Sequence, residues 1–160
     1  MPIRPKFTKE DIRRRFDRFV EVVERRELER LKYLGELCVT HARSVPADRG
    51  FHDRTGNLRS SIGYVIYKNG VAVMDNFAEV NGPEGGNAAE AIQKAKTVAD
   101  RAARKHPTGF CLVVTAGMEY AVYVESKGRD VLASAEALAR REMPTMMKEL
   151  VDNIKKSVEP

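Results

Sequence analysis

The chain has 160 residues, of which 42% are hydrophobic and 32% are charged. We expect one domain, 1–160, because a chain of this length can bury roughly 70% of its unfolded surface without disulfides or a metal. No run of about 18 apolar residues is present, which argues against a membrane-spanning helix. Cys38 and Cys111 lie far apart and outside any CxxC pair, so both are expected as buried or half-buried thiols in a reducing cytoplasm.

The net charge of +5 is unevenly distributed. Residues 1–68 carry 16 Lys and Arg against 10 Asp and Glu, whereas residues 69–160 carry 12 against 13. A basic half can face nucleic acid or an acidic partner. It can also be a solvated helix face, and the interleaving of arginines with glutamates favours this second interpretation.

The first predicted element is a long helix over residues 8–44. Thr8 followed by Asp11 resembles a capping box, with Asp in place of the usual Glu or Gln. Apolar residues then recur at three- and four-residue steps, from Ile12 to Ala42. A continuous helix of this length measures about 55 Å at 1.5 Å per residue, which exceeds the width of a 160-residue globule. Either the helix breaks near Gly35, or another subunit covers part of its apolar stripe.

A β-hairpin is predicted over residues 57–76. Two apolar runs flank Asn69-Gly70, and this dipeptide is typical of a type I′ turn, in which both central residues need positive φ. Alternation in the first strand is expected to place Leu58 and Ile62 on one face.

The remaining pattern predicts an inserted loop and helix over residues 77–107, then a strand and a short segment over 110–125. The short segment is either a strand or one helical turn. A C-terminal helix follows over 131–158, with Pro144 as a kink or boundary. The order predicts an α+β fold: a small antiparallel sheet of 3–4 strands packed against a long N-terminal helix, an inserted helix and a C-terminal helix, with the helices on one face.

The search for catalytic groups gives no convincing active site. His41 follows Cys38 by three residues on one helix face, a spacing that a nucleophilic pair could use but that a core thiol beside a surface imidazole explains better. His52-Asp53 has no second His or Cys at metal-ligand spacing. We therefore expect no enzymatic activity, no catalytic residue, no metal site and no cofactor.

Two further patterns lack the partners that chemistry requires. The glycine-rich run at 82–86 has neither the GK[ST] ending of a phosphate loop nor the GxGxxG order of a dinucleotide fold. Glu119 and Glu125 have no third group that would assign them acid and base roles.

Nucleic-acid binding stays open as an alternative. The first helix carries a partly basic face that phosphate contact could use. Acidic residues lie between the arginines and can neutralise much of their field through i, i+4 pairs. The residues of this face are Arg13, Arg14, Arg18 and Arg25.

Two short segments stand out together. The first is Arg-Thr-Gly-Asn-Leu-Arg-Ser-Ser-Ile at 54–62, and the second is Tyr-Ala-Val-Tyr-Val-Glu-Ser-Lys-Gly at 120–128. Their order, between a leading and a trailing helix, resembles the tail-component family of long-tailed phages typified by coliphage Hong Kong 97, with its TGxLxxS and YAxYVExG motifs. The resemblance covers roughly residues 8–75 and 108–158. The motif residues are Arg54, Thr55, Gly56, Asn57, Leu58, Ser60, Tyr120, Ala121, Tyr123, Val124, Glu125 and Gly128.

The resemblance implies a non-enzymatic phage or prophage virion structural protein, a head–tail joining (neck) or tail completion subunit that acts by ring assembly. Its implied partners are copies of itself and neighbouring connector or tail-tube proteins, with DNA contact left open and no membrane. The implied location is the virion, after synthesis in the bacterial host cytoplasm. Three departures leave its station in the virion open: Ser126-Lys127 after the glutamate, Asp130-Val131-Leu132 before the last helix, and the insertion at 77–107.

The motif residues also have direct physical interpretations. Thr55-Gly56-Asn57 can form a tight turn in which Gly56 takes a conformation that a Cβ forbids and the Thr hydroxyl caps the turn. Tyr120 and Tyr123 suit a core edge or an interface. Glu125 is expected to pair with Arg54 or Arg59. All of these roles are equally compatible with maintenance of the fold inside one subunit.

Overall fold

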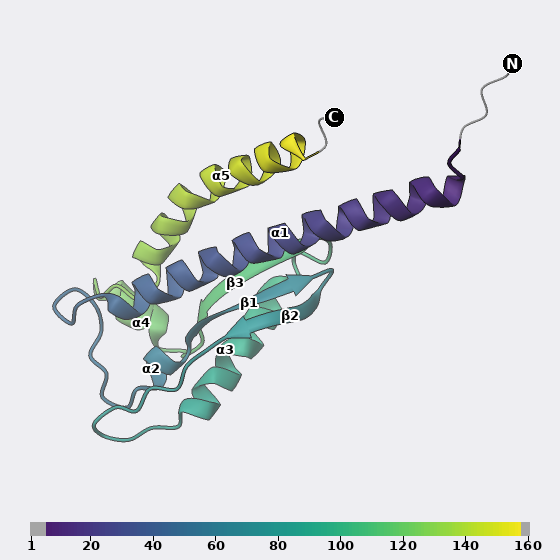
Figure 1. Cartoon of the computed structure of the whole chain (residues 1–160). Helices are drawn as coiled ribbons and strands as arrows, with labels where there is room; N and C mark the ends of the chain where they lie inside the picture. The colour runs from purple at the N-terminus through teal and green to yellow at the C-terminus, as the bar shows by residue number, and fades with distance from the viewer. Residues whose placement is uncertain (1–5, 158–160) are drawn as a thin grey trace, which may run out of the picture.

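Three antiparallel strands and five helices make an α+β structure in the computed structural model, which describes residues 6–157 (Figure 1). The elements are α1 (Lys9–Ser44), α2 (Asn57–Ser60), β1 (Ile62–Lys68), β2 (Val71–Asn76), α3 (Ala88–Ala103), β3 (Phe110–Ala116), α4 (Ala121–Ser126) and α5 (Ala133–Lys156). The predicted end of the last helix at residue 158 lies outside the described residues. None of the described helices combines the length and apolar character needed to cross a membrane.

Helix α1 is continuous, and its predicted capping box is confirmed. The Thr8 hydroxyl accepts a hydrogen bond from the Asp11 amide at 3.1 Å, and the Asp11 carboxylate accepts one from the Thr8 amide at 2.9 Å. The helix does not break at Gly35. A Cβ there would lie 2.8 Å from the ring of Tyr64, so this glycine lets strand β1 pack directly against the helix.

The sheet has the order β2-β1-β3, with β1 in the centre. The predicted Asn-Gly hairpin is confirmed, because Asn69 and Gly70 have φ values of 51° and 78°, as a type I′ turn requires. On the other side of β1, the register places Ile62 beside Ala116, so the start of β1 and the end of β3 meet at one end of the sheet.

Helices cover both faces of this sheet, so the expectation that they share one face is wrong. α1 and α5 pack on the side of Ile62 and Tyr64, whereas α3 packs on the side of Val65 and Tyr67 (Figure 1). Strand β1 reflects this arrangement, because every residue from Ile62 to Tyr67 is buried. A strand with one solvated face would instead alternate between buried and exposed residues.

The predicted hairpin begins too early. Residues 57–60 form the helical turn α2, in which the Ser60 amide donates to the Gly56 carbonyl at 2.9 Å. Leu58 is buried from this turn, so the expected strand face shared by Leu58 and Ile62 is wrong. Of the two alternatives for residues 120–125, the helical turn is the one found, as α4.

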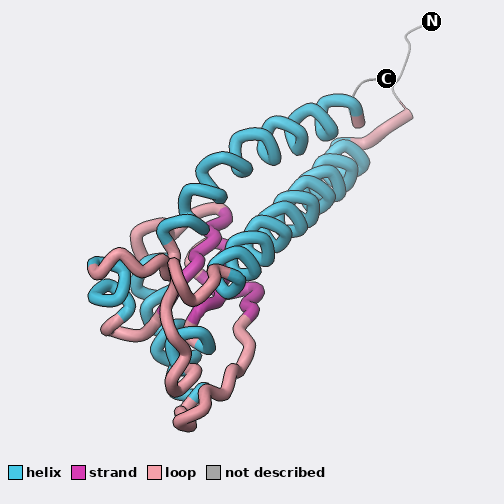
Figure 2. Tube along the Cα trace, turned by 90° about the vertical axis from the view of Figure 1, so that its left-hand side faces the viewer, coloured by secondary structure: helices cyan, strands magenta, loops and turns pink. Residues whose placement is uncertain are grey.

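Helix α5 runs antiparallel to α1 and passes through Pro144 without a break. Its first turn reaches His41, whose Nε2 lies 3.0 Å from the Ser134 hydroxyl, and Glu149 pairs with Arg30 at 3.2 Å. Pro144 lies on the solvent side, where the carbonyl that it leaves without an intrahelical donor can meet water, and the helix curves along its length (Figure 2).

Candidate functional site

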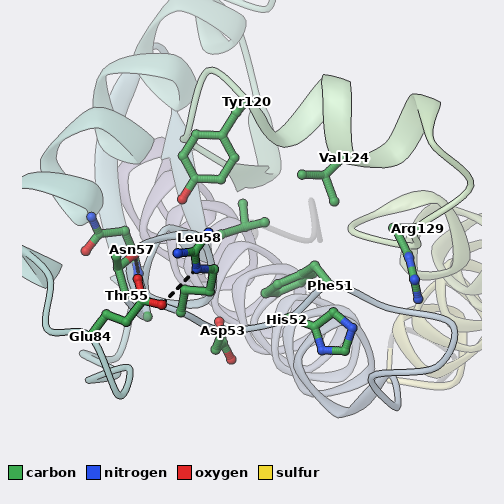
Figure 3. A pocket seen from close by; sticks show the side chains of 12 residues that line it. Phe51, His52, Asp53, Thr55, Asn57, Leu58, Glu84, Tyr120, Val124 and Arg129 are labelled. Atoms are coloured by element: carbon green, nitrogen blue, oxygen red, sulfur yellow. Dashed lines mark hydrogen bonds and ion pairs between the residues drawn. The ribbon is translucent and has the colours of Figure 1, made fainter.

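The two motif segments surround one open cavity at the end of the sheet where β1 begins and β3 ends (Figure 3). Its volume is about 580 Å³, and its walls come from the loop before α2, the loop near Glu84 and helix α4. Thr55, Gly56, Asn57 and Leu58 lie on one side and Tyr120 and Val124 on the other. The sequence motifs are therefore neighbours in space.

The predicted tight turn at Gly56 is confirmed, and it clamps the loop at 80–87. Gly56 has a φ of 78°, and a Cβ there would lie 2.1 Å from the Val80 carbonyl oxygen. The Thr55 hydroxyl accepts a long hydrogen bond of 3.4 Å from the Asn57 amide. Across the clamp, the Gly82 amide donates to the Thr55 carbonyl at 3.2 Å. Only glycine combines this φ with such close backbone contact.

Polar side chains of the first motif hold the same loop. The buried Ser60 hydroxyl donates to the Val80 carbonyl at 3.1 Å and accepts from the Val80 amide at 2.8 Å. The Asn57 side-chain oxygen accepts from the Asn87 amide at 2.9 Å. Satisfying buried backbone groups in this way fixes the loop that leads into α3. The insertion at 77–107 is thus bonded to the motif.

A half-buried charge cluster lies beside the cavity, and sequence reasoning missed it. Arg59 pairs with Asp53 and also donates to the Arg43 carbonyl, while its guanidinium lies 5.1 Å from the centre of the Phe51 ring. Arg43 donates to the Ile62 carbonyl at 2.7 Å, and burial together with the nearby Arg59 charge lowers its pKa. In the sequence, Arg43 is recognisable only as a basic residue in the last turn of a predicted helix. Such a residue interacts favourably with the helix dipole, and this gives no indication that Arg59 and Asp53 lie nearby.

Neither arginine in the first motif pairs with Glu125, so that expectation is wrong. Arg54 donates to Glu84 at 2.9 Å, and Arg59 is committed to Asp53. Glu125 instead accepts hydrogen bonds from the amides of Leu132 and Ala133 at 2.9 and 2.8 Å. A carboxylate at that position satisfies two donors at the start of α5 and interacts favourably with the helix dipole.

The second motif combines anchored and exposed residues. Ala121 is buried, and Gly128 ends α4 with a φ of 77°, a common helix C-terminal geometry. Val122 and Tyr123 are 76% and 63% exposed. The ring of Tyr120 lies over the cavity (Figure 3), where burial raises the pKa of its hydroxyl and the nearby Thr55 side chain partly offsets this. An apolar surface therefore borders the cavity.

The candidate nucleophiles are engaged in packing. Cys38 is 1% exposed and donates weakly to the Ala135 carbonyl at 3.7 Å, whereas His41 contacts Ser134. Burial raises the pKa of both the Cys38 and Cys111 thiols, which lowers the thiolate fraction that a nucleophile needs. Across residues 6–157, no group of three or more His, Cys, Asp or Glu side chains could hold a metal ion.

Most of the predicted basic face lies on the N-terminal part of α1, which extends beyond the sheet (Figure 1), whereas Arg25 lies near Lys68 and Phe110 at the end of the sheet. Arg13, Arg14, Arg18 and Arg25 are all exposed, and Arg14 pairs with Asp11.

Comparison of the chain with protein-family models, with curated proteins and with solved structures gave no match. The interpretation of the site therefore depends on its residues and their geometry.

Proposed function

We propose that this chain is a non-enzymatic phage or prophage virion structural protein, a head–tail joining or tail completion subunit that acts by assembling into a ring. One observation carries the proposal most directly. Two motif segments that are separated by 57 intervening residues converge on one end of the sheet and leave an apolar surface beside them.

Some motif residues fix the backbone and others are exposed to solvent, and this combination supports an assembly role. Gly56, Ser60 and Glu125 are committed to fixing backbone, through the loop clamp and the start of α5. Val122 and Tyr123, on the same short helix, project apolar surface into solvent. A rigid base that presents exposed aromatic and aliphatic side chains is suited to contact with another protein surface. We place the ring contact on this surface, named here the α4 face (Tyr120, Val122 and Tyr123).

Genetic disruption in the phage or prophage that encodes the chain tests this function. Without the chain, we expect lysates in which filled heads and tails accumulate unjoined under the electron microscope. Complementation with the wild-type chain should restore joined particles, and Tyr123→Arg should not, because a charge would be buried in the contact. A matched control is Tyr33→Arg, since Tyr33 is 60% exposed on α1 and lies outside the α4 face. Joined, infectious particles in the absence of the chain would contradict the proposal.

The alternative, a basic nucleic-acid-binding protein, has one favourable observation: the exposed arginines of α1. Residues 9–25 nevertheless carry six basic side chains against five acidic ones, which leaves little net field for phosphate. Duplex affinity that falls steeply with salt and disappears in an Arg13→Gln, Arg18→Gln, Arg25→Gln variant would favour this alternative over ring assembly.

A further inference from the structure

The N-terminal part of α1, residues 9–25, is named here the arm. It extends past the end of α5 (Figure 1), and only its last turn meets the end of the sheet, where Glu24 pairs with Lys68 at 2.7 Å. Ile12, Phe16 and Phe19 in the arm are 53%, 63% and 37% exposed, and Val23 is half-buried. These four residues are spaced by four, three and four positions, so they form one stripe along the helix.

The stripe continues the face of α1 that α5 covers. Arg30, Leu34 and His41 follow Val23 at steps of seven, four and seven residues, which keeps them on the same helix face. Arg30 and His41 on this face both contact α5. The last turns of α5 lie opposite Arg26, where Arg26, Glu29, Leu150 and Asn153 line a shallow pocket. Beyond that point no described segment covers the stripe, so the same face is packed in the body and open in the arm.

We propose that the arm is a self-association surface, which pairs antiparallel with the arm of a second copy of this chain. The palindromic spacing of the stripe places Ile12 opposite Val23 of the second copy and Phe16 opposite its Phe19. The contact is two-fold and isologous. It does not rest on the proposed function, and it is separate from the α4 face that would make the head-to-tail contacts of a ring.

The distribution of charge along α1 selects the antiparallel orientation. Residues 13–18 contain four arginines and one aspartate, whereas residues 21–29 contain four glutamates and two arginines. In the register set by the stripe, an antiparallel pair places the basic residues 13–18 opposite residues 17–22 of the other copy, which include Asp17 and Glu21 against one arginine, and Arg13 lies near Glu24. A parallel pair places like charges together, which destabilises helix pairing.

The same charges disfavour a lipid surface as the occupant of the stripe. Amphipathic helices that bind anionic membranes carry a strongly basic polar face. The five acidic residues among residues 9–25 cancel most of the six basic charges.

The contact between two arms is about 17 Å long at 1.5 Å per residue and is therefore smaller than a standard interface. We expect a dimer that dissociates on dilution.

Sedimentation equilibrium of the full chain over a range of concentrations measures this association. We expect a reversible monomer–dimer equilibrium based on the 18.0 kDa chain. The variant Ile12→Gln, Phe16→Gln, Phe19→Gln should weaken the dimer about tenfold or more and keep the wild-type urea midpoint, since these side chains are exposed. Tyr33→Gln removes an aromatic that is 60% exposed on α1 outside the arm and should leave the equilibrium unchanged. A wild-type monomer at all concentrations, or equal weakening by both variants, would overturn the proposal.

Disulfide trapping distinguishes the orientations. Mixing chains that carry Ile12→Cys with chains that carry Val23→Cys should give a crosslinked pair on oxidation, whereas Ile12→Cys alone should not, and the wild-type chain controls for Cys38 and Cys111. Crosslinking of Ile12→Cys to itself would show a parallel pair, and the absence of any crosslink would show that the stripe docks elsewhere; both contradict the proposal. Binding to anionic phosphatidylserine vesicles that Phe16→Gln abolishes, with no dimer in solution, would also contradict it.

Discussion

Gly56→Ala tests the clamp between the first motif and the loop at 80–87. Part of the cost is the φ of 78°, which is strained for any residue with a Cβ by about 1 kcal/mol. The larger part comes from the neighbours of the new Cβ, 2.1 Å from the Val80 oxygen and 2.7 Å from the Gly82 nitrogen. Both are backbone atoms, so relief requires the loop to move.

That movement breaks three hydrogen bonds, one from the Gly82 amide to Thr55 and two between Ser60 and Val80. At about 1 kcal/mol for each bond, the total loss is about 4 kcal/mol. This is a large fraction of the roughly 5–15 kcal/mol by which a domain is stable. We expect Gly56→Ala to lower the urea midpoint strongly without a change in the denaturant slope.

Gly85→Ala is the matched control. Gly85 has a φ of 71°, but a Cβ there would meet nothing within 4 Å. It therefore carries only the backbone strain, about 1 kcal/mol. Equilibrium urea unfolding followed by circular dichroism measures both variants. Equal losses of stability at Gly56 and Gly85 would refute the clamp, because they would show that the loop contact adds nothing.

Three further outcomes are expected. Ser60→Ala should cost about 1–3 kcal/mol, because both backbone groups of Val80 lose a buried partner; an unchanged urea midpoint would show that water replaces the hydroxyl. Glu125→Ala should cost about 1 kcal/mol through loss of the α5 cap, whereas Glu119→Ala, at an exposed position, should cost little; equal effects would exclude the cap. Burial, with the Glu36 carboxylate that accepts its hydrogen bond, raises the pKa of Tyr64 from 10.0 to about 12. Because the folded-state pKa is the higher one, this contribution to stability is complete below about pH 10 and is lost as the pH rises toward 12. Urea unfolding of wild type and Tyr64→Phe across this range measures it, and identical pH dependence in the two proteins would contradict the assignment.

Local rules predicted the elements whose geometry depends on near neighbours in sequence. Thr8 and Asp11 are three residues apart, and their capping box forms as predicted. Asn69-Gly70 needs only positive φ at two consecutive residues, and the hairpin follows. The length of α1 was also predictable, because its apolar period continues through Gly35.

The wrong predictions concern features whose geometry depends on tertiary contacts between distant parts of the chain. The period-2 pattern after Leu58 is compatible with a strand, but Gly56 in the left-handed region starts a helical turn there. The sequence offers Arg54 and Arg59 as partners for Glu125. In the structure, the carboxylate of Glu125 instead accepts hydrogen bonds from the backbone amides at the start of α5. The Arg43–Asp53–Arg59 cluster joins three separate segments, and no spacing rule connects them.

The site itself was predictable as two motifs but not as a cavity. Sequence order shows that the segments at 54–62 and 120–128 flank strands, and the antiparallel register of β1 with β3 brings them to one end of the sheet. The bonds to the loop at 80–87 depend on an insertion whose path no local pattern indicates.

Immunogold labelling of gradient-purified virions with an antibody against the chain tests the assembly role most directly. We expect gold at a single place on each particle, at the head–tail junction or on the tail, and peptides of the chain among the virion proteins by mass spectrometry. A chain that stays wholly in the host fraction, with unlabelled and complete particles, would contradict the role of a virion structural subunit.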